Sequence, residues 1–240
     1  MGPKYIRREL SAVIEEAYRY FSVITVTGPR QSGKTTLIRN LFPHLPYYSL
    51  ENLDVRSFAE NDPVAFLNQH AEGMILDEVH NAPNLLSYIQ GMVDDDADRR
   101  FILSGSSQFA MLKRITQSLA GRTAVFELLP LSYSEIREIA SDTPLDHLLL
   151  DGFYPAIYSG RNVPKFLYPA YMKTYLDKDV RDLLQIKDMM QFHTFIRLCA
   201  GRIGSLFKAS ELANEIGISS HTITAWLSVL QASYIVALLP

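Results

Sequence analysis

The sequence predicts an α/β fold in which a five-stranded parallel sheet is flanked by helices and followed by a smaller, all-helical region. Three observations support this prediction. Short β-rich apolar runs alternate with helical patterns over the first two-thirds of the 240 residues, two of these runs are almost uninterrupted hydrophobic segments, and the strand signal fades after Pro130. Such alternation is typical of parallel strands joined by crossover helices, and continuous hydrophobic runs are typical of strands covered on both faces.

The elements of the α/β region can be placed individually. The predicted strands are rich in β-branched and apolar residues. They are Ser22–Thr27, Tyr47–Leu50, Gly73–Leu76, Arg100–Ser104 and Ala124–Leu129. The helices predicted between them adjoin turn-forming residues. They are Lys34–Leu41, Pro63–His70, Asn84–Asp94 and Ser107–Ser118.

The rest of the chain is predicted to be helical. Helical patterns cover Ser132–Ile139 and Pro164–Leu184, and a third block, Lys208–Leu230, contains two helical segments around Gly217. In that block a small residue, a turn glycine and an apolar residue follow one another in the order that a helix-turn-helix requires. The sequence therefore predicts a helix-turn-helix near the end of the chain.

Composition excludes several classes of protein. The contents of 48% hydrophobic and 20% charged residues are typical of a folded domain and not of a disordered chain. No apolar run reaches the roughly 20 residues of a membrane helix, and Met1–Leu10 is charged where a signal peptide is apolar, so we expect a cytoplasmic protein without membrane contact. The net charge of -3 gives no global attraction for nucleic acid. The single Cys199 is more typical of a core residue than of a nucleophile.

A phosphate-binding pattern lies after the first predicted strand. Residues 28–35, Gly-Pro-Arg-Gln-Ser-Gly-Lys-Thr, match G-x-x-x-x-G-K-[ST] between a β-rich run and an amphipathic helix. We expect the loop N–H groups and the helix N-terminus to face phosphates, Lys34 to reach the β- and γ-phosphates and Thr35 to ligate Mg²⁺. The residues predicted to bind the nucleotide are Gly28, Arg30, Gln31, Ser32, Gly33, Lys34, Thr35 and Thr36. The alternative interpretation is a glycine-containing turn with a surface lysine.

Two carboxylates, Asp77 and Glu78, follow the third predicted strand. They stand at the carboxyl edge of the sheet, where open α/β sheets bind their ligands. We expect Asp77, together with Thr35, to hold the metal, and Glu78 to polarise the attacking water as a general base. Taken alone, two acids after a strand are usually a solvated turn. Their combination with the phosphate loop favours the catalytic interpretation.

Two further candidates are Ser104 and Arg122. Ser104 ends the fourth predicted strand at the same edge of the sheet, where its hydroxyl is expected to sense the γ-phosphate or the water. The alternative for Ser104 is to cap the next helix. Arg122 precedes the fifth strand and is expected either to stabilise transition-state charge on the nucleotide of a neighbouring subunit or to be an ordinary surface cation.

The order of these features resembles that of the AAA-type ATPases. A narrower resemblance is to a bacterial and archaeal group of uncharacterised ATPases. The segments that carry it are Tyr5–Leu10, Gly28–Gln31, Leu76–His80, Leu103–Ser107, Leu119–Arg122, Leu129–Ser132 and the Tyr-rich Tyr171–Asp182. The resemblance spans nearly the whole chain and implies an AAA-like P-loop module that uses ATP. Members of the group usually carry Thr where Ser104 stands, which keeps the hydroxyl.

Members of this group continue with a winged helix and a restriction-endonuclease-like domain. The chain stops at Pro240, where the wing is expected to begin, so we expect a truncated form without the nuclease-like domain. On this basis residues 1–140 are the AAA-like P-loop ATPase core. Residues 141–200 are a helical lid or connector, and residues 201–240 are an incomplete winged helix-turn-helix.

The sequence supports DNA binding only weakly. The second helix of the helix-turn-helix is expected to expose His221, Thr222 and Thr224, without Lys or Arg, although phosphate contacts supply much of the affinity of DNA-binding proteins. Basic residues in the Tyr-rich region alternate with aspartates, which is typical of a solvated, ion-paired surface. Internal packing or protein contact is therefore the favoured role of this helix.

Three functions remain to be compared. The leading hypothesis is a magnesium-dependent ATPase whose turnover is coupled to a conformational or assembly change, in a homo-oligomer where Arg122 acts in trans. The second is a nucleotide-dependent switch that hydrolyses ATP slowly or only when assembled, associated with DNA through the winged helix. The third is a nucleic-acid-binding module with a vestigial ATP site, against which the complete set of Lys34, Thr35, Asp77 and Glu78 argues.

Overall fold

The computed structural model describes residues 5–105, 118–174 and 188–239. It contains two compact units, Met1–Val163 and Pro164–Pro240. Nearly all of the predicted helix Ser107–Ser118 and the second half of the predicted helix Pro164–Leu184 lie outside the described residues. The division of the chain at residues 140 and 200 stays a prediction.

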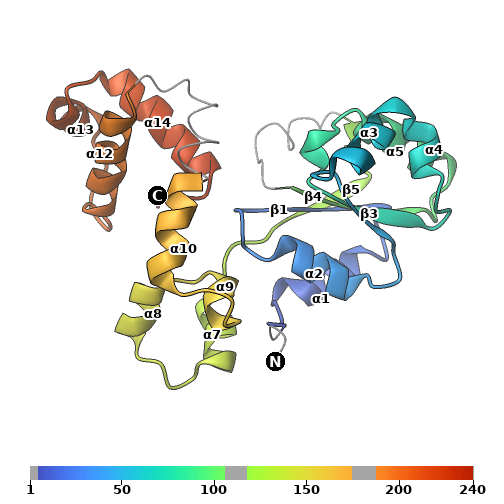
Figure 1. The fold of residues 1–240 in the computed structure, drawn as a ribbon, viewed down its shortest axis with the longest axis horizontal. Coiled ribbons are helices and arrows are strands. Elements are labelled where there is room, and N and C mark those ends of the chain that lie inside the picture. Colours follow the sequence, from blue (N-terminus) through green and yellow to red (C-terminus); the bar gives the residue numbers. More distant parts are fainter. Residues whose placement is uncertain (1–4, 106–117, 175–187, 240) are drawn as a thin grey trace. The chain divides into compact units, whose positions relative to one another are not determined.

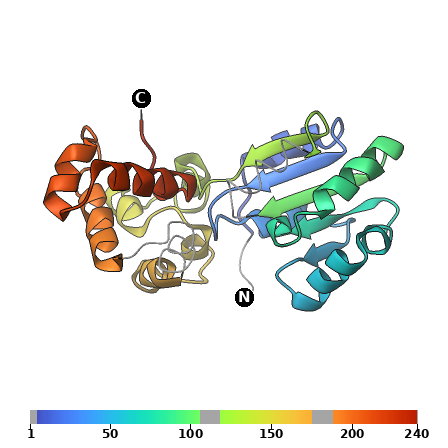
Figure 2. The ribbon, with the colours of Figure 1, turned by 90° about the horizontal axis from the view of Figure 1, so that it is seen from above.

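A five-stranded parallel sheet forms the centre of the first unit (Figure 1; the strand arrows can also be followed in Figure 2). The strands are β1 (Val23–Thr27), β2 (Tyr47–Ser49), β3 (Gly73–Asp77), β4 (Arg100–Gly105) and β5 (Thr123–Glu127). Their order is β2-β3-β4-β1-β5, and β1 pairs with β4 and β5 in parallel. The predicted five-stranded parallel sheet is confirmed, with boundaries that differ by one or two residues.

Helices cover both faces of the sheet. Figure 1 shows α1 and α2 on one face and α3, α4 and α5 on the other. Their bounds, with those of a 3-10 turn, are α1 Leu10–Ala17, α2 Lys34–Leu41, α3 Leu53–Asn61, α4 Pro63–Leu67, η1 Val79–Asn81 and α5 Leu85–Asp95. The predicted helix Pro63–His70 is therefore shorter than expected, and α1 and α3 were not predicted.

The core explains why the central strands are continuous apolar runs. Val23 packs in the cluster beneath α3–α5, whereas its neighbour Ile24 packs in the cluster beneath α1 and α2. Leu76 and Ile75 of β3 divide in the same way between these two clusters. Successive side chains of a strand point to opposite faces, so a strand buried on both faces has no polar face.

In the described part of the first unit, three short helices follow β5. They are α7 (Tyr133–Ile139), α8 (Leu145–Asp151) and α9 (Pro155–Tyr158). A capping box begins α7: the Ser132 hydroxyl accepts from the Glu135 N–H, and the Glu135 carboxylate accepts from the Ser132 N–H. This arrangement satisfies two N–H groups that a helix start leaves without partners. It also fixes the position of Glu135 beside the candidate site.

The second unit is helical, as predicted. Its described helices are α10 (Pro164–Tyr171), α12 (Met189–Ala200), α13 (Ala209–Ile216) and α14 (Ser220–Ala232). The Trp226 ring centroid lies 5.2 Å from that of Phe192 and 5.7 Å from that of Phe195, which packs α14 on α12. Gly217 ends α13 with a φ of 80°, a left-handed conformation that glycine adopts without strain. Within the described part of the chain, no helix has the length and apolarity that crossing a bilayer requires.

Candidate functional site

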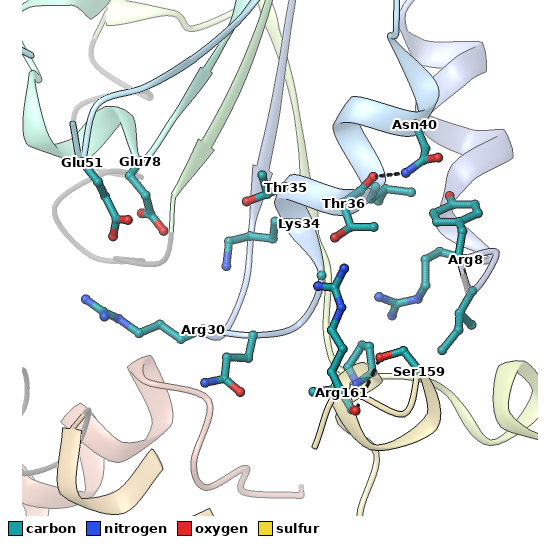
Figure 3. A pocket seen from close by; sticks show the side chains of 17 residues that line it. Arg8, Arg30, Lys34, Thr35, Thr36, Asn40, Glu51, Glu78, Ser159 and Arg161 are labelled. Atoms are coloured by element: carbon teal, nitrogen blue, oxygen red, sulfur yellow. Dashed lines mark hydrogen bonds between the residues drawn. The ribbon is translucent and has the colours of Figure 1, made fainter. Parts of the chain in front are cut away.

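The candidate site lies at the carboxyl edge of the sheet. The phosphate loop follows β1, Glu78 follows β3, and Ser104 belongs to the end of β4. Parallel strands bring these ends to one edge. A cavity of about 670 Å³ opens there, and Figure 3 shows side chains from the loop, from α2 and from several other segments around it. All the residues that line it belong to the first unit.

Six of the eight residues predicted to bind the nucleotide line this cavity. They are Arg30, Gln31, Gly33, Lys34, Thr35 and Thr36. Of the other two, Ser32 is fully buried, and its hydroxyl has no hydrogen-bond partner among the described residues. Gly28 has a φ of 140°, and a Cβ there would lie 2.2 Å from the Leu128 carbonyl oxygen. Only glycine can therefore begin the loop beside β5.

The backbone of the loop presents N–H groups without internal acceptors. Gly33 has a φ of 97° and stands directly before α2. Across the described residues, the N–H groups of residues 33–36 have no hydrogen-bond acceptor. Successive free N–H groups at a helix start form a concave site for anions, and the helix dipole adds to their positive potential. The cavity is therefore built to accept a phosphate group.

Lys34 adds a buried positive charge. The residue is 5% exposed, and its Nζ donates to the carbonyl oxygens of Gly28, at 2.9 Å, and Pro29, at 2.8 Å. Burial lowers the pKa of Lys34 below the usual lysine value, while Glu78 and Asp77 act in the opposite direction. Because this ammonium group has lost its water, a phosphate bound beside it would stabilise its charged form more than it would in solvent.

Asp77 accepts hydrogen bonds from three hydroxyl groups. Its Oδ2 accepts from Thr35 Oγ1 at 2.7 Å and from the Tyr47 hydroxyl at 2.8 Å. Its Oδ1 accepts from Ser104 Oγ. Burial, followed by the hydrogen bond to Asp77, raises the pKa of Tyr47 to about 12, so this hydroxyl keeps its proton and remains a donor at neutral pH. Three elements thus hold one carboxylate in a single orientation.

These oxygens fit a magnesium ion. Thr35 Oγ1 and Asp77 Oδ2 lie 2.7 Å apart beside the cavity. The described residues contain no cluster of three or more His, Cys, Asp or Glu that could enclose a metal. Mg²⁺ commonly binds through one or two protein oxygens and completes its shell with water and substrate phosphates. The donor set present is therefore suitable for Mg²⁺ bound together with a nucleotide.

Glu78 has an unusual backbone conformation. Its φ of 54° and ψ of 47° are left-handed, which is uncommon for a residue with a side chain and is concentrated at functional sites. Glu78 lines the cavity, and Figure 3 shows its side chain together with that of Glu51. The Nδ1 atom of His80 lies 3.1 Å from Glu78 Oε2. The turn after β3 therefore directs a carboxylate towards the place where a phosphate is expected.

Comparisons with known proteins agree with this geometry. Residues 20–137 match a family described as an AAA domain, and residues 142–240 match a domain of unknown function. Among solved structures, the chain is similar to a Walker-type ATPase of Pyrococcus abyssi, with a TM-score of 0.59 and 14% identity over 95% of this chain and 90% of that one. The chain has the fold of an AAA-type P-loop ATPase.

Curated relatives of the chain include uncharacterised proteins of Mycobacterium tuberculosis and Mycobacterium bovis. Each is 30% identical to the chain over 239 residues, which are 96% of this chain and 52% of the relative. The chain thus spans about half the length of the curated relatives it matches. The predicted P-loop fold is confirmed, whereas the winged helix and the restriction-endonuclease-like domain are not.

Arg122 lies apart from the other predicted site residues. It directly precedes β5, at the amino edge of the sheet, whereas the cavity of this AAA-type fold is at the carboxyl edge. Its Nε lies 2.5 Å from Asp94 Oδ1 and its Nη2 lies 2.8 Å from Asp94 Oδ2. This ion pair raises the pKa of Arg122 and lowers that of Asp94. A role on the nucleotide of a neighbouring subunit stays a prediction.

Several residues near the site were not predicted from the sequence, among them Tyr47, Glu51, Arg161 and Arg8. Tyr47 carries no motif and approaches Asp77 only because β2 lies beside β3. Glu51 and Arg161 line the cavity from segments without a recognised pattern, and Figure 3 shows the Arg161 side chain extending into the cavity. Arg8 lies in a segment that carries the family resemblance but no binding motif, although its side chain contacts the phosphate loop directly.

Proposed function

We propose that the chain binds ATP with Mg²⁺ in this cavity and hydrolyses its terminal phosphoanhydride bond. The observation that carries the proposal is the convergence of the free N–H groups of residues 33–36, Lys34 and the Thr35–Asp77 pair at one edge of the sheet. Each group meets a different requirement of phosphoryl transfer, namely anion binding, charge neutralisation and metal placement. The AAA-type fold supports the same function.

Each residue has a defined task in this proposal. The loop N–H groups and Lys34 bind and orient the phosphates, and Thr35 and Asp77 hold Mg²⁺. When bound, the metal neutralises charge on the phosphate oxygens. Glu78 accepts a proton from the attacking water. Ser104 holds the Asp77 carboxylate through its hydrogen bond, so in the described structure it is a positioning residue, and direct sensing of the γ-phosphate stays a prediction.

A nucleotide-dependent switch is the second candidate. The observation that favours it is the 3.1 Å approach of His80 Nδ1 to Glu78 Oε2. His80 Nδ1 is buried and makes no hydrogen bond to this carboxylate among the described residues, but the adjacent ring limits how Glu78 can approach a water, so hydrolysis would be slow until assembly or a partner moved the ring. The position of Arg122, at the far edge of the sheet from the cavity, is compatible with such an assembly-dependent mechanism.

The work coupled to ATP turnover belongs to the same proposal. We infer that nucleotide binding and hydrolysis drive a conformational or assembly change, because the chain matches a second family over residues 142–240 beside its AAA domain. The helix-turn-helix of α13 and α14 offers little for DNA. The described residues of α14 include no Lys or Arg, and DNA-binding proteins depend on such phosphate contacts.

Phosphate release from ATP and Mg²⁺, measured over a series of protein concentrations, tests the proposal. Glu78→Gln is expected to abolish release while keeping ATP bound, and Lys34→Ala is expected to abolish binding. The matched control is Glu72→Gln, which makes the same change at the opposite end of β3 and is expected to leave release unchanged.

The concentration series separates the candidates. Release that rises more than linearly with protein concentration supports an oligomeric ATPase. ATP binding without release at any concentration refutes the enzyme and supports the switch. A wild-type chain that binds no ATP refutes both, and salt-sensitive retention of DNA by such a chain would support a nucleic-acid-binding module with a vestigial site.

A further inference from the structure

A buried arginine outside the phosphate-binding motif holds the phosphate loop at the edge of the cavity, and Arg8 itself also lines that cavity (Figure 3). Arg8 is 7% exposed. Its Nη1 donates to the carbonyl oxygen of Ser32 at 2.8 Å, and its Nη2 donates to those of Leu129, at 2.7 Å, and Pro130, at 3.1 Å. One side chain therefore connects the loop after β1 with the segment after β5.

The guanidinium is fixed by a buried partner. Arg8 Nε lies 3.0 Å from Glu135 Oε1, and the Glu135 residue is 5% exposed. Glu135 Oε1 also accepts from the Glu9 N–H at 2.7 Å, and its Oε2 accepts from the Ser132 N–H at 2.8 Å. Because the carboxylate has partners on both oxygens, the position of Arg8 is set by the start of α7 rather than by solvent.

The contact to Ser32 determines where the next N–H points. In a trans peptide the carbonyl and the N–H of one unit point in opposite directions. Arg8 holds the Ser32 carbonyl on one side, so the Gly33 N–H of the same peptide unit is directed to the other side. Gly33 lines the cavity, and its N–H has no acceptor among the described residues.

This restraint matters because the second residue of that peptide unit is a glycine. Gly33 has a φ of 97°, and a glycine can exchange between positive and negative φ at little cost. The Ser32–Gly33 peptide can therefore flip at little conformational cost. A flip would point a carbonyl oxygen at the phosphate instead of an N–H.

We propose that Arg8 is a positioning residue that prevents this flip and so maintains the phosphate-binding form of the loop. The proposal rests on the proposed function, since it concerns the same nucleotide site. The same contacts tie the loop to the start of the chain, where Tyr5 and Ile6 line the cavity. Arg8 thereby links phosphate binding to the segment that forms another wall of the nucleotide site.

The test compares the affinity of Arg8→Gln and wild type for ADP, together with the amide NMR signal of Gly33. Loss of one charge-assisted hydrogen bond to a phosphate lowers affinity about ten- to a hundredfold, and we expect a loss of that size. In the wild type, ADP is expected to shift the Gly33 amide signal downfield, and in Arg8→Gln this shift should be absent or much smaller. Arg8→Lys, which keeps the charge but has no planar fork, should fall between the two.

Two control variants separate positioning from general loss of stability. Arg7→Gln makes the same change at the adjacent exposed position and should bind ADP as the wild type does. Asp62→Ala removes the cap of α4, a helix to which Arg8 makes no hydrogen bond within the described part of the chain. It should lower the melting temperature but keep the affinity and the Gly33 shift. If Arg8→Gln does not fold, the ADP affinity and the Gly33 shift of Arg8→Lys are compared with those of the wild type instead.

The outcomes are distinct. If Arg8→Gln has a lower melting temperature but binds ADP with wild-type affinity and shows a wild-type Gly33 shift, the proposal is overturned. The proposed function is unaffected by that result. Equal losses in Arg8→Gln and Asp62→Ala also overturn the proposal, because stability alone would then explain the effect. A wild-type chain that binds no ADP overturns the proposed function, and the role of Arg8 with it.

Discussion

Replacing Gly28 by alanine should disrupt both the fold of the first unit and its nucleotide site. The new Cβ would lie 2.2 Å from the Leu128 carbonyl oxygen and 3.0 Å from the Leu128 carbonyl carbon, and the φ of 140° is strained for alanine. Both neighbours are backbone atoms and cannot rotate away. The loop and the end of β5 must therefore separate by roughly 1 Å, since a normal carbon–oxygen contact is above about 3 Å.

The structure sets the size of this effect. Overpacking costs about 1–3 kcal/mol, and an unfavourable positive φ costs about 1–3 kcal/mol more. The free energy of unfolding should therefore fall by about 2–6 kcal/mol. For a unit of this size each kcal/mol corresponds to about 2–4 °C, so the melting temperature should fall by about 4–24 °C. Thermal unfolding followed by circular dichroism measures the melting temperature. Titration of the folded variant with ADP measures whether the affinity of the site is lost.

Two other glycines provide the controls. A Cβ at Gly73 would lie 1.7 Å from the Arg100 carbonyl oxygen, at the amino end of β3, so Gly73→Ala should destabilise the fold without a specific loss of ADP affinity. A Cβ at Gly91, inside α5, meets no atom within 4 Å. Gly91→Ala should stabilise by about 0.5–1 kcal/mol, because alanine is the better helix former. A Gly28→Ala protein that melts as the wild type does would refute the reasoning.

Three further results are expected. Tyr47→Phe removes one of the donors to Asp77. Because Tyr47 is only partly buried, the free energy of unfolding should fall by about 1 kcal/mol, and the Mg²⁺ concentration needed for ATP binding should rise several-fold. Unchanged unfolding curves and Mg²⁺ titrations would show that Tyr47 does not hold Asp77. Burial lowers the pKa of Lys34, whereas bound phosphates raise it. The affinity for ADP should therefore be highest below the Lys34 pKa of the free protein, and it should fall as the pH rises from that value to the Lys34 pKa of the complex. Isothermal titrations at increasing pH should show this fall in the wild type and not in Lys34→Arg. Arg161→Ala should weaken ADP binding about three- to tenfold and leave the melting temperature within the error of the measurement, whereas wild-type affinity would show that Arg161 does not contact the nucleotide.

Local patterns were sufficient to predict the sheet and the phosphate loop. The five strands were found because burial on both faces removes polar residues from them, as the division of Val23 and Ile24 between two clusters shows. The loop was found because its glycines are required by backbone geometry that nearby residues impose, as at Gly28. Helix α3 was missed although Asn52 caps it by accepting from the N–H groups of Asp54 and Val55, because the segment is short and largely polar.

The sequence by itself determined where the main candidate residues lie: Lys34, Thr35 and Asp77 stand in segments whose spacing and flanking strands already place them at one edge of a parallel sheet. The tertiary structure alone decided which other residues join them. Tyr47 reaches Asp77 because β2 pairs with β3, and Arg8 reaches the loop because Glu135, far along the chain, holds its guanidinium. Such contacts depend on which elements become neighbours after folding, and no spacing within one segment records them.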